Sequence, residues 1–97
     1  MSRQKRDKKG KFMARIIDSE KTNIVGANVK IWRKRRRMSQ QTLSNKLELL
    51  GVYVCRGSVS RIEDGSRTVT DIELIAISKV LHVSLDDLFL NADKYFE

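Results

Sequence analysis

The chain of 97 residues has no proline, one histidine and one cysteine. The lone Cys55 cannot form an intrachain disulfide, and the absence of a Cys/His cluster predicts neither a metal site nor a cofactor. Apolar runs of only a few residues exclude a transmembrane helix, and a charged N-terminus with no apolar stretch behind it excludes a secretory signal. The sequence offers no nucleophile beside a base, no paired carboxylates and no phosphate-cradling loop, so an enzyme is not expected. These absences predict a soluble cytoplasmic protein that acts by binding.

The charge of the chain gives the first positive indication of a partner. Twenty Lys and Arg against twelve acids give a formal net charge of +8 and a pI near 10.0. Such a balance favours a polyanion, either a nucleic acid or an anionic membrane surface. Residues 1–23 hold eight basic residues against three acids, and Arg33–Arg37 is an unbroken basic run. That run is either a solvated helix face or a surface that attracts a nucleic-acid backbone.

Four places in the chain carry the pattern of a helix start. A capping side chain accepts a hydrogen bond from an orphaned amide, and an apolar residue before the cap packs on one four positions into the helix. Three places show both features: Met38–Ser39 with Leu43, Val69–Thr70 with Leu74, and Val83–Ser84 with Leu88. Thr70 and Glu73 add the spacing of a capping box, and Val54–Cys55 with Val59 repeats the frame with a weaker cap.

Apolar periodicity predicts five helices and no sheet. The first runs from about Ile24 to Arg36. The other four are indicated by Leu43, Leu47 and Leu50, ended by Gly51; by Val59 and Ile62, ended by Asp64–Gly65; by Leu74, Ile77 and Leu81; and by Leu85, Leu88 and Phe89. The strand-like Val52–Val54 is too short to build a sheet. A chain of this length holds one modest core, so we predict an all-α domain of five helices over residues 24–90, between an N-terminal arm (1–23) and a short tail (91–97).

The stretch from Ile24 to Phe89 resembles the Cro and lambda-repressor-like (XRE-type) helix-turn-helix domains. The resemblance is carried by Met38–Leu43 (MSQQTL), Ser58–Gly65 (SVSRIEDG) and Leu81–Phe89 (LHVSLDDLF), and covers about two thirds of the chain. It implies two short helices joined by a tight connection, the second of which enters the major groove of DNA.

Position by position, the resemblance implies roles for nine residues. Base readout falls to Arg56, Gly57, Ser58 and Arg61, because arginine can bond bidentately to guanine. Phosphate contacts fall to Ser39, Gln40 and Arg67. Arg33 and Glu63 match a structural ion pair that ties the first helix to the third. Two simpler interpretations stay open: Arg61 as a solvated surface residue, and Ser39 and Gln40 as parts of a helix cap alone.

Three features depart from the family pattern. Between Leu43 and Ser58 the chain has about five extra residues, which we interpret as added helix on the apolar stripe of Leu50 plus a longer loop. Cys55 stands where a Ser or Thr cap is usual; it is either inert packing or a thiol of lowered pKa beside Arg56 that acts as a redox switch. His82 stands where glycine often ends a helix, and we expect it to adopt the left-handed conformation.

The arm of residues 1–23 lies outside the resemblance. Its Phe12, Ile16 and Ile17 are able to pack onto the domain or a partner, and its basic residues to follow a DNA backbone or enter a minor groove. A tail without fixed structure is an equal alternative.

The sequence thus predicts a sequence-specific, double-stranded-DNA-binding transcriptional regulator at the nucleoid, a repressor of phage, mobile-element or restriction-control type. Small readers of this kind often act as two-fold dimers on palindromic operators, with half-sites ~34 Å apart. A homodimer has apolar surface available near the C-terminus: Leu88, Phe89, Leu90, Tyr95 and Phe96. Two alternatives are an antitoxin or anti-regulator acting through a protein partner, which the apolar C-terminus supports, and an RNA binder, against which the lack of aromatics at stacking spacing argues.

Overall fold

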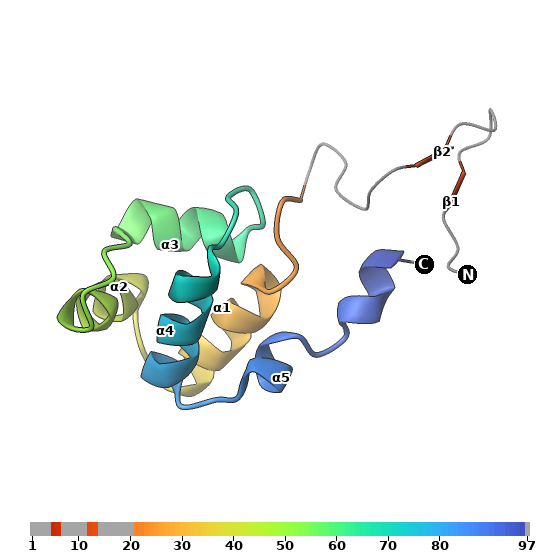
Figure 1. The fold of residues 1–97 in the computed structure, drawn as a ribbon. Helices are drawn as coiled ribbons and strands as arrows, with labels where there is room; N and C mark the ends of the chain where they lie inside the picture. The colour runs from red at the N-terminus through yellow and green to blue at the C-terminus, as the bar shows by residue number, and fades with distance from the viewer. Residues whose placement is uncertain (1–4, 7–11, 14–20, 97) are drawn as a thin grey trace.

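The computed structural model describes residues 5–6, 12–13 and 21–96, with side chains for residues 21–94 (Figure 1). Five α-helices form the domain: α1 (Gly26–Arg35), α2 (Gln40–Leu49), α3 (Arg56–Glu63), α4 (Asp71–Leu81) and α5 (Leu85–Leu88). A 3-10 helix, η1 (Ala92–Phe96), follows them. Nearer the N-terminus, β1 (Lys5–Arg6) and β2 (Phe12–Met13) pair antiparallel, with Lys5 opposite Met13. The predicted five-helix, all-α fold is confirmed, whereas η1 and the short strand pair were not expected.

All four predicted helix starts are confirmed, and three of them carry a side-chain cap. The side chains of Ser39, Thr70 and Ser84 each accept a hydrogen bond from the amide three residues later. Thr70 with Glu73 completes the predicted capping box, and Ser84 with Asp87 makes a second one. Each cap satisfies one of the amides that a helix N-terminus leaves unpaired.

The apolar residues before these caps pack against a single core that all five helices share. Met38, Val69 and Val83 are half-buried against it. The core itself consists of Val25, Val29, Leu43, Leu47, Val54, Val59, Ile62, Ala76, Ile77, Val80, Leu81 and Leu88. Because Leu88 is fully buried there, its predicted place on an exposed dimer surface is wrong; its neighbours Phe89 and Leu90 are exposed.

The helix ends differ from expectation in two places. The helix α1 begins at Gly26 rather than near Ile24, because Asn23 accepts a hydrogen bond from the Gly26 amide and occupies the turn before it. The predicted apolar stripe does not extend to Leu50, since α2 ends at Leu49 and Leu50 is half exposed. The predicted ends at Gly51 and His82 are confirmed, with φ of 84° and 58° respectively.

In the part of the chain that the structure describes, no helix has the length and apolar character needed to cross a bilayer. The same residues contain no group of three or more His, Cys, Asp or Glu side chains placed to hold a metal ion.

Candidate nucleic-acid interface

The helices α2 and α3 are joined by a six-residue connection, Leu50–Cys55, that the core holds in place. Gly51 closes α2 in the left-handed region, where a residue without a Cβ is unstrained. Val52 then packs against the core and Val54 is buried in it. The added residues of this chain therefore form an ordered turn with two apolar anchors, which leads the backbone directly into α3 (Figure 1).

The helix α3 has one buried and one exposed side. Val59, Ile62 and Glu63 are buried, whereas Arg56 and Arg61 are exposed. Four of the residues with predicted DNA roles thus lie together within two turns: Arg56, Gly57, Ser58 and Arg61. Arg61 Nη2 donates to Ser58 Oγ at 3.1 Å, so these two side chains are placed side by side before any ligand binds.

Cys55 is the N-cap of α3, but its side chain makes no capping hydrogen bond. Its Sγ lies 3.4 Å from Ser58 Oγ, to which it donates. The Ser58 hydroxyl, followed by the nearby Ser58 and Gly57 amides and the charge of Arg61, favours the thiolate and holds the pKa of the Cys55 thiol below its ordinary value. The half-buried thiol therefore belongs to the same polar cluster as Ser58 and Arg61.

Two of the residues with predicted phosphate roles, Ser39 and Gln40, stand at the start of α2. The Ser39 hydroxyl caps the helix and donates to Thr42 Oγ1 at 3.0 Å. Gln40 Nε2 donates to Glu63 Oε1 at 3.0 Å. Both side chains are thus engaged inside the domain, while the amides of the first helical turn point out of the helix.

A buried carboxylate joins α1, α2 and α3. Glu63 Oε2 accepts from Arg33 Nε at 2.6 Å, and Glu63 Oε1 accepts from Arg33 Nη2 at 3.0 Å. The third guanidinium nitrogen, Nη1, donates to the Met38 carbonyl at 2.7 Å. With Gln40 included, one cluster ties the start of α2 and the end of α3 to α1, and it sets the angle between the two helices of the motif.

The N-terminal end of α1 also contacts the end of α3, through a residue that the sequence did not single out. Gly26 lies so close to the Ile62 carbonyl that any Cβ would clash with it. Asn23 Nδ2 donates to the same carbonyl at 3.1 Å and to the Arg67 carbonyl at 2.8 Å. The Thr22 amide donates to the Gly65 carbonyl at 2.7 Å. Residues 21–23, which the sequence assigned to the arm, therefore brace the turn after α3.

Arg67, the third predicted phosphate contact, forms an ion pair with Glu73. The distances are 2.9 Å from Nη1 to Oε1 and 3.0 Å from Nη2 to Oε2. Hydrogen bonding with Arg67, and then with the Thr70 amide, lowers the pKa of the Glu73 carboxyl. Because Glu73 is also the last member of the capping box, Arg67 links the turn after α3 to the start of α4.

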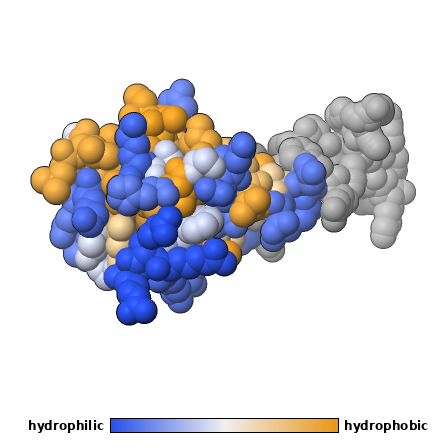
Figure 2. All heavy atoms as spheres, turned by 90° about the horizontal axis from the view of Figure 1, so that it is seen from below, coloured by the Kyte–Doolittle hydropathy of each residue, from blue (hydrophilic) through white to orange (hydrophobic). Residues whose placement is uncertain are grey.

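The basic run at the end of α1 is divided among different roles. Arg33 is buried in the cluster described above. The guanidinium groups of Arg35 and Arg36 lie over the Trp32 ring, at 4.8 and 5.3 Å from its centroid. Arg36 also donates from Nε to the Leu81 carbonyl at 2.7 Å and from Nη2 to the His82 carbonyl at 3.0 Å. Figure 2 shows strongly hydrophilic residues gathered on the face that carries this end of α1.

The fold, the exposed polar side of α3 and the excess of positive charge define a helix-turn-helix DNA-binding domain. The helix-turn-helix family model matches residues 29–88, and the chain belongs to this family, in its Cro and lambda-repressor-like (XRE-type) branch. It is a DNA-binding transcriptional regulator. No curated protein sequence matches the chain.

Several solved structures share the fold. The restriction-modification controller protein C.AhdI from Aeromonas hydrophila is 25% identical, with a TM-score of 0.59 over 67% of this chain and 87% of that one. The clp gene regulator ClgR from Corynebacterium glutamicum is 21% identical, with a TM-score of 0.63 over 73% of this chain and 70% of that one. The DNA-binding domain of BldD is 22% identical, with a TM-score of 0.59 over 74% and 97%.

Proposed function

We propose that the chain is a sequence-specific repressor of phage, mobile-element or restriction-control type that reads duplex DNA through α3. The observation that carries this proposal is the two-sided character of α3: Val59 and Ile62 are almost fully buried, while Arg56 and Arg61 are exposed on the other side. Long cationic side chains on a rigid helix suit the acceptors at the guanine edge in the major groove. The likeness to a restriction-modification controller agrees with the proposed class of regulator.

Arg56 and Arg61 are the proposed base contacts, with Ser58 holding Arg61 in place through the 3.1 Å hydrogen bond. Gly57 borders Arg61, since a Cβ built on it would lie in ordinary van der Waals contact with Arg61 Nη1, at 3.6 Å. The first amides of α2, with Ser39 and Gln40, are the proposed phosphate site. The guanidinium of Arg67 already pairs with Glu73, so in this proposal it binds Glu73 and a phosphate at the same time.

We further propose a homodimer that binds a palindromic operator. Three exposed apolar side chains lie at the C-terminal end of the domain: Leu85, Phe89 and Leu90, with exposed fractions of 38%, 39% and 52%. Asn28 Nδ2 holds this segment against α1 by donating to the Leu88 and Leu90 carbonyls, each at 2.9 Å. The side chains of Tyr95 and Phe96, also predicted for this surface, lie outside the described residues.

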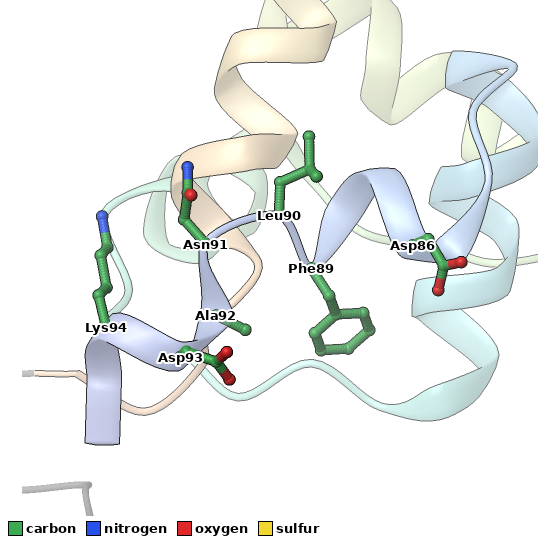
Figure 3. Close-up of a pocket in the computed structure, with 7 residues that line it drawn as sticks. All are labelled: Asp86, Phe89, Leu90, Asn91, Ala92, Asp93 and Lys94. Carbon is green, nitrogen blue, oxygen red and sulfur yellow. The ribbon is translucent and has the colours of Figure 1, made fainter. Parts of the chain in front are cut away.

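The end of α5 and the segment after it line a hollow of about 550 Å³. Figure 3 shows the Phe89 ring between the carboxylates of Asp86 and Asp93, with Ala92 beside it. Apolar side chains in a hollow whose edge carries charges of both signs, Asp86, Asp93 and Lys94, suit the same surface of a second copy. This arrangement supports the proposed dimer surface.

Selection of bound duplexes from a random pool, at two salt concentrations, tests the proposal. A palindromic consensus with half-sites ~34 Å apart is the expected result for a dimeric specific reader. Absence of enrichment, together with binding that disappears as salt rises, would leave a purely electrostatic binder and refute the specific regulator.

A second candidate function is that of an antitoxin or anti-regulator whose main partner is a protein. The observation that favours it is a further set of exposed apolar side chains on α2, the following turn and α4: Leu49, Leu50, Tyr53, Ile72 and Ile75. Leu49 is 85% exposed, and a gathering of exposed apolar side chains is typical of a protein interaction site. Co-purification of a stoichiometric protein that Ile72→Glu releases is the expected result for this alternative.

In either case the chain acts by binding, without a cofactor and without catalysis. The proposed site of action is the nucleoid, in the cytoplasm.

A further inference from the structure

The basic run at the end of α1 holds two cations that the fold leaves unused. Of its five members, Arg33 pairs with Glu63, and Arg35 and Arg36 lie against Trp32. Lys34 and Arg37 are exposed, and neither makes an ion pair or a side-chain hydrogen bond with any residue that the structure describes. The helix α1 contains no acidic residue that offsets them.

These two cations lie together and adjoin the start of α2. The Arg37 amide donates to the Lys34 carbonyl at 3.0 Å, which closes the last turn of α1 and brings the two residues to the same turn. Arg37 is two residues before Ser39, so their Cα atoms are at most about 7.6 Å apart. The Met38 amide donates to the Arg33 carbonyl at 3.1 Å, and Arg33 Nη1 bonds to the Met38 carbonyl in return. The segment between the cations and α2 is therefore rigidly held.

We propose that Lys34 and Arg37 bind the phosphate backbone of the same duplex that α3 reads, and that they supply the cationic charge of the phosphate site at the start of α2. The inference rests on the proposed function and adds two residues to it. The polar side chains at that place, Ser39 and Gln40, are neutral and already bonded to Thr42 and Glu63. The neighbouring unpaired cations of Lys34 and Arg37 carry the charge that attracts a phosphate.

The backbone conformation of Arg37 allows its side chain to be removed without strain. Its φ is 60°, in the left-handed region that favours glycine over a residue with a long side chain. Replacing Arg37 by glycine therefore removes the side chain while relieving the backbone. His82, with φ of 58°, offers the same relief at the end of α4 and serves as the matched control.

The experiment measures the affinity of the full chain for its selected duplex at several salt concentrations. Arg37→Gly should reduce the slope of log K against log[salt] by about 0.9, the value of one phosphate contact, and Lys34→Gln should do the same. Between about 50 and about 200 mM salt, the ratio of wild-type to variant affinity should then shrink about three- to fourfold. Arg37→Lys should keep the wild-type slope. The thermal midpoint of Arg37→Gly should not fall, which separates lost binding from lost folding.

Two control variants test whether the effect is specific to the surface of Lys34 and Arg37. His82→Gly should leave affinity and slope unchanged, and Lys79→Gln, which removes an exposed cation from the last turn of α4, should leave the slope unchanged. An unchanged slope in Arg37→Gly, or an equal loss in Lys79→Gln, would overturn the inference and leave the specific reader intact. Failure of the wild type itself to bind any duplex would instead refute the proposed function.

Discussion

The guanidinium of Arg33 and the carboxylate of Glu63 meet in a fork of two hydrogen bonds, and both side chains are almost completely buried, with exposed fractions of 8% and 3%. This pair joins α1 to the last residue of α3, the proposed DNA-reading helix. Since Gln40 bonds to the same carboxylate, the position of α2 relative to α3 also depends on it.

Replacing Glu63 by glutamine should lower the free energy of unfolding by about 3 kcal/mol, because the buried charge of Arg33 would lose its counter-ion. Urea unfolding followed by circular dichroism measures the change. The double variant Arg33→Met/Glu63→Leu should lose much less, since neither charge then remains buried. Equal losses in the single and double variants would contradict this account.

Replacing Arg36 by alanine should cost about 1 kcal/mol, because the Leu81 and His82 carbonyls at the end of α4 would lose their donor. The adjacent Lys34→Ala removes an exposed cation without such contacts and should stay within about 0.5 kcal/mol of the wild type. Thermal unfolding of the two variants compares them directly. A larger loss in Lys34→Ala than in Arg36→Ala would contradict the assigned role.

A fall in pH should lower the free energy of unfolding of the domain, in part through protonation of Glu73. Hydrogen bonds from Arg67, and then from Thr70, lower the pKa of this carboxyl in the folded state, so the unfolded chain binds the proton more readily. The stabilisation is present above the unfolded pKa of 4.5 and is lost as the pH falls through the lower folded value. Unfolding curves across this range should be less pH-dependent in Glu73→Gln than in Glu48→Gln, an exposed control on α2. Identical pH profiles would refute the linkage.

Replacing Arg61 by alanine should reduce the affinity for the selected duplex by about 1–3 kcal/mol and relax base preference at one position. Binding to a panel of single-base variants measures both effects. Lys46→Ala, an exposed change on α2, should leave the preference unaltered. Unaltered preference in Arg61→Ala would mean that another side of α3 reads the bases.

Placing a charge at Leu90 should dissociate the proposed dimer, because a carboxylate would be buried at its apolar surface. Sedimentation equilibrium should show the wild type as a dimer and Leu90→Glu as a folded monomer. Ile72→Glu, on the other exposed apolar set, should remain dimeric. The reverse pattern would move the interface to α4.

The sequence by itself determined the features that depend on a few neighbouring residues. The caps at Ser39, Thr70 and Ser84 each involve an amide three residues away, and the left-handed ends at Gly51 and His82 follow from local backbone sterics. Such interactions repeat at fixed spacing, so they can be predicted from the order of residues alone.

Apart from the Arg33–Glu63 pair, which the family resemblance implied, only the tertiary structure decided which charges of the basic run are used inside the fold. Arg33 and Arg36 find their partners 30 and 45 residues along the chain, while Lys34 and Arg37 find none among the described residues. The close approach of Gly26 to the end of α3 likewise depends on how α1 crosses α3. Five adjacent cations are chemically alike in the sequence, and the packing of α1 against α3 and α4 makes them different.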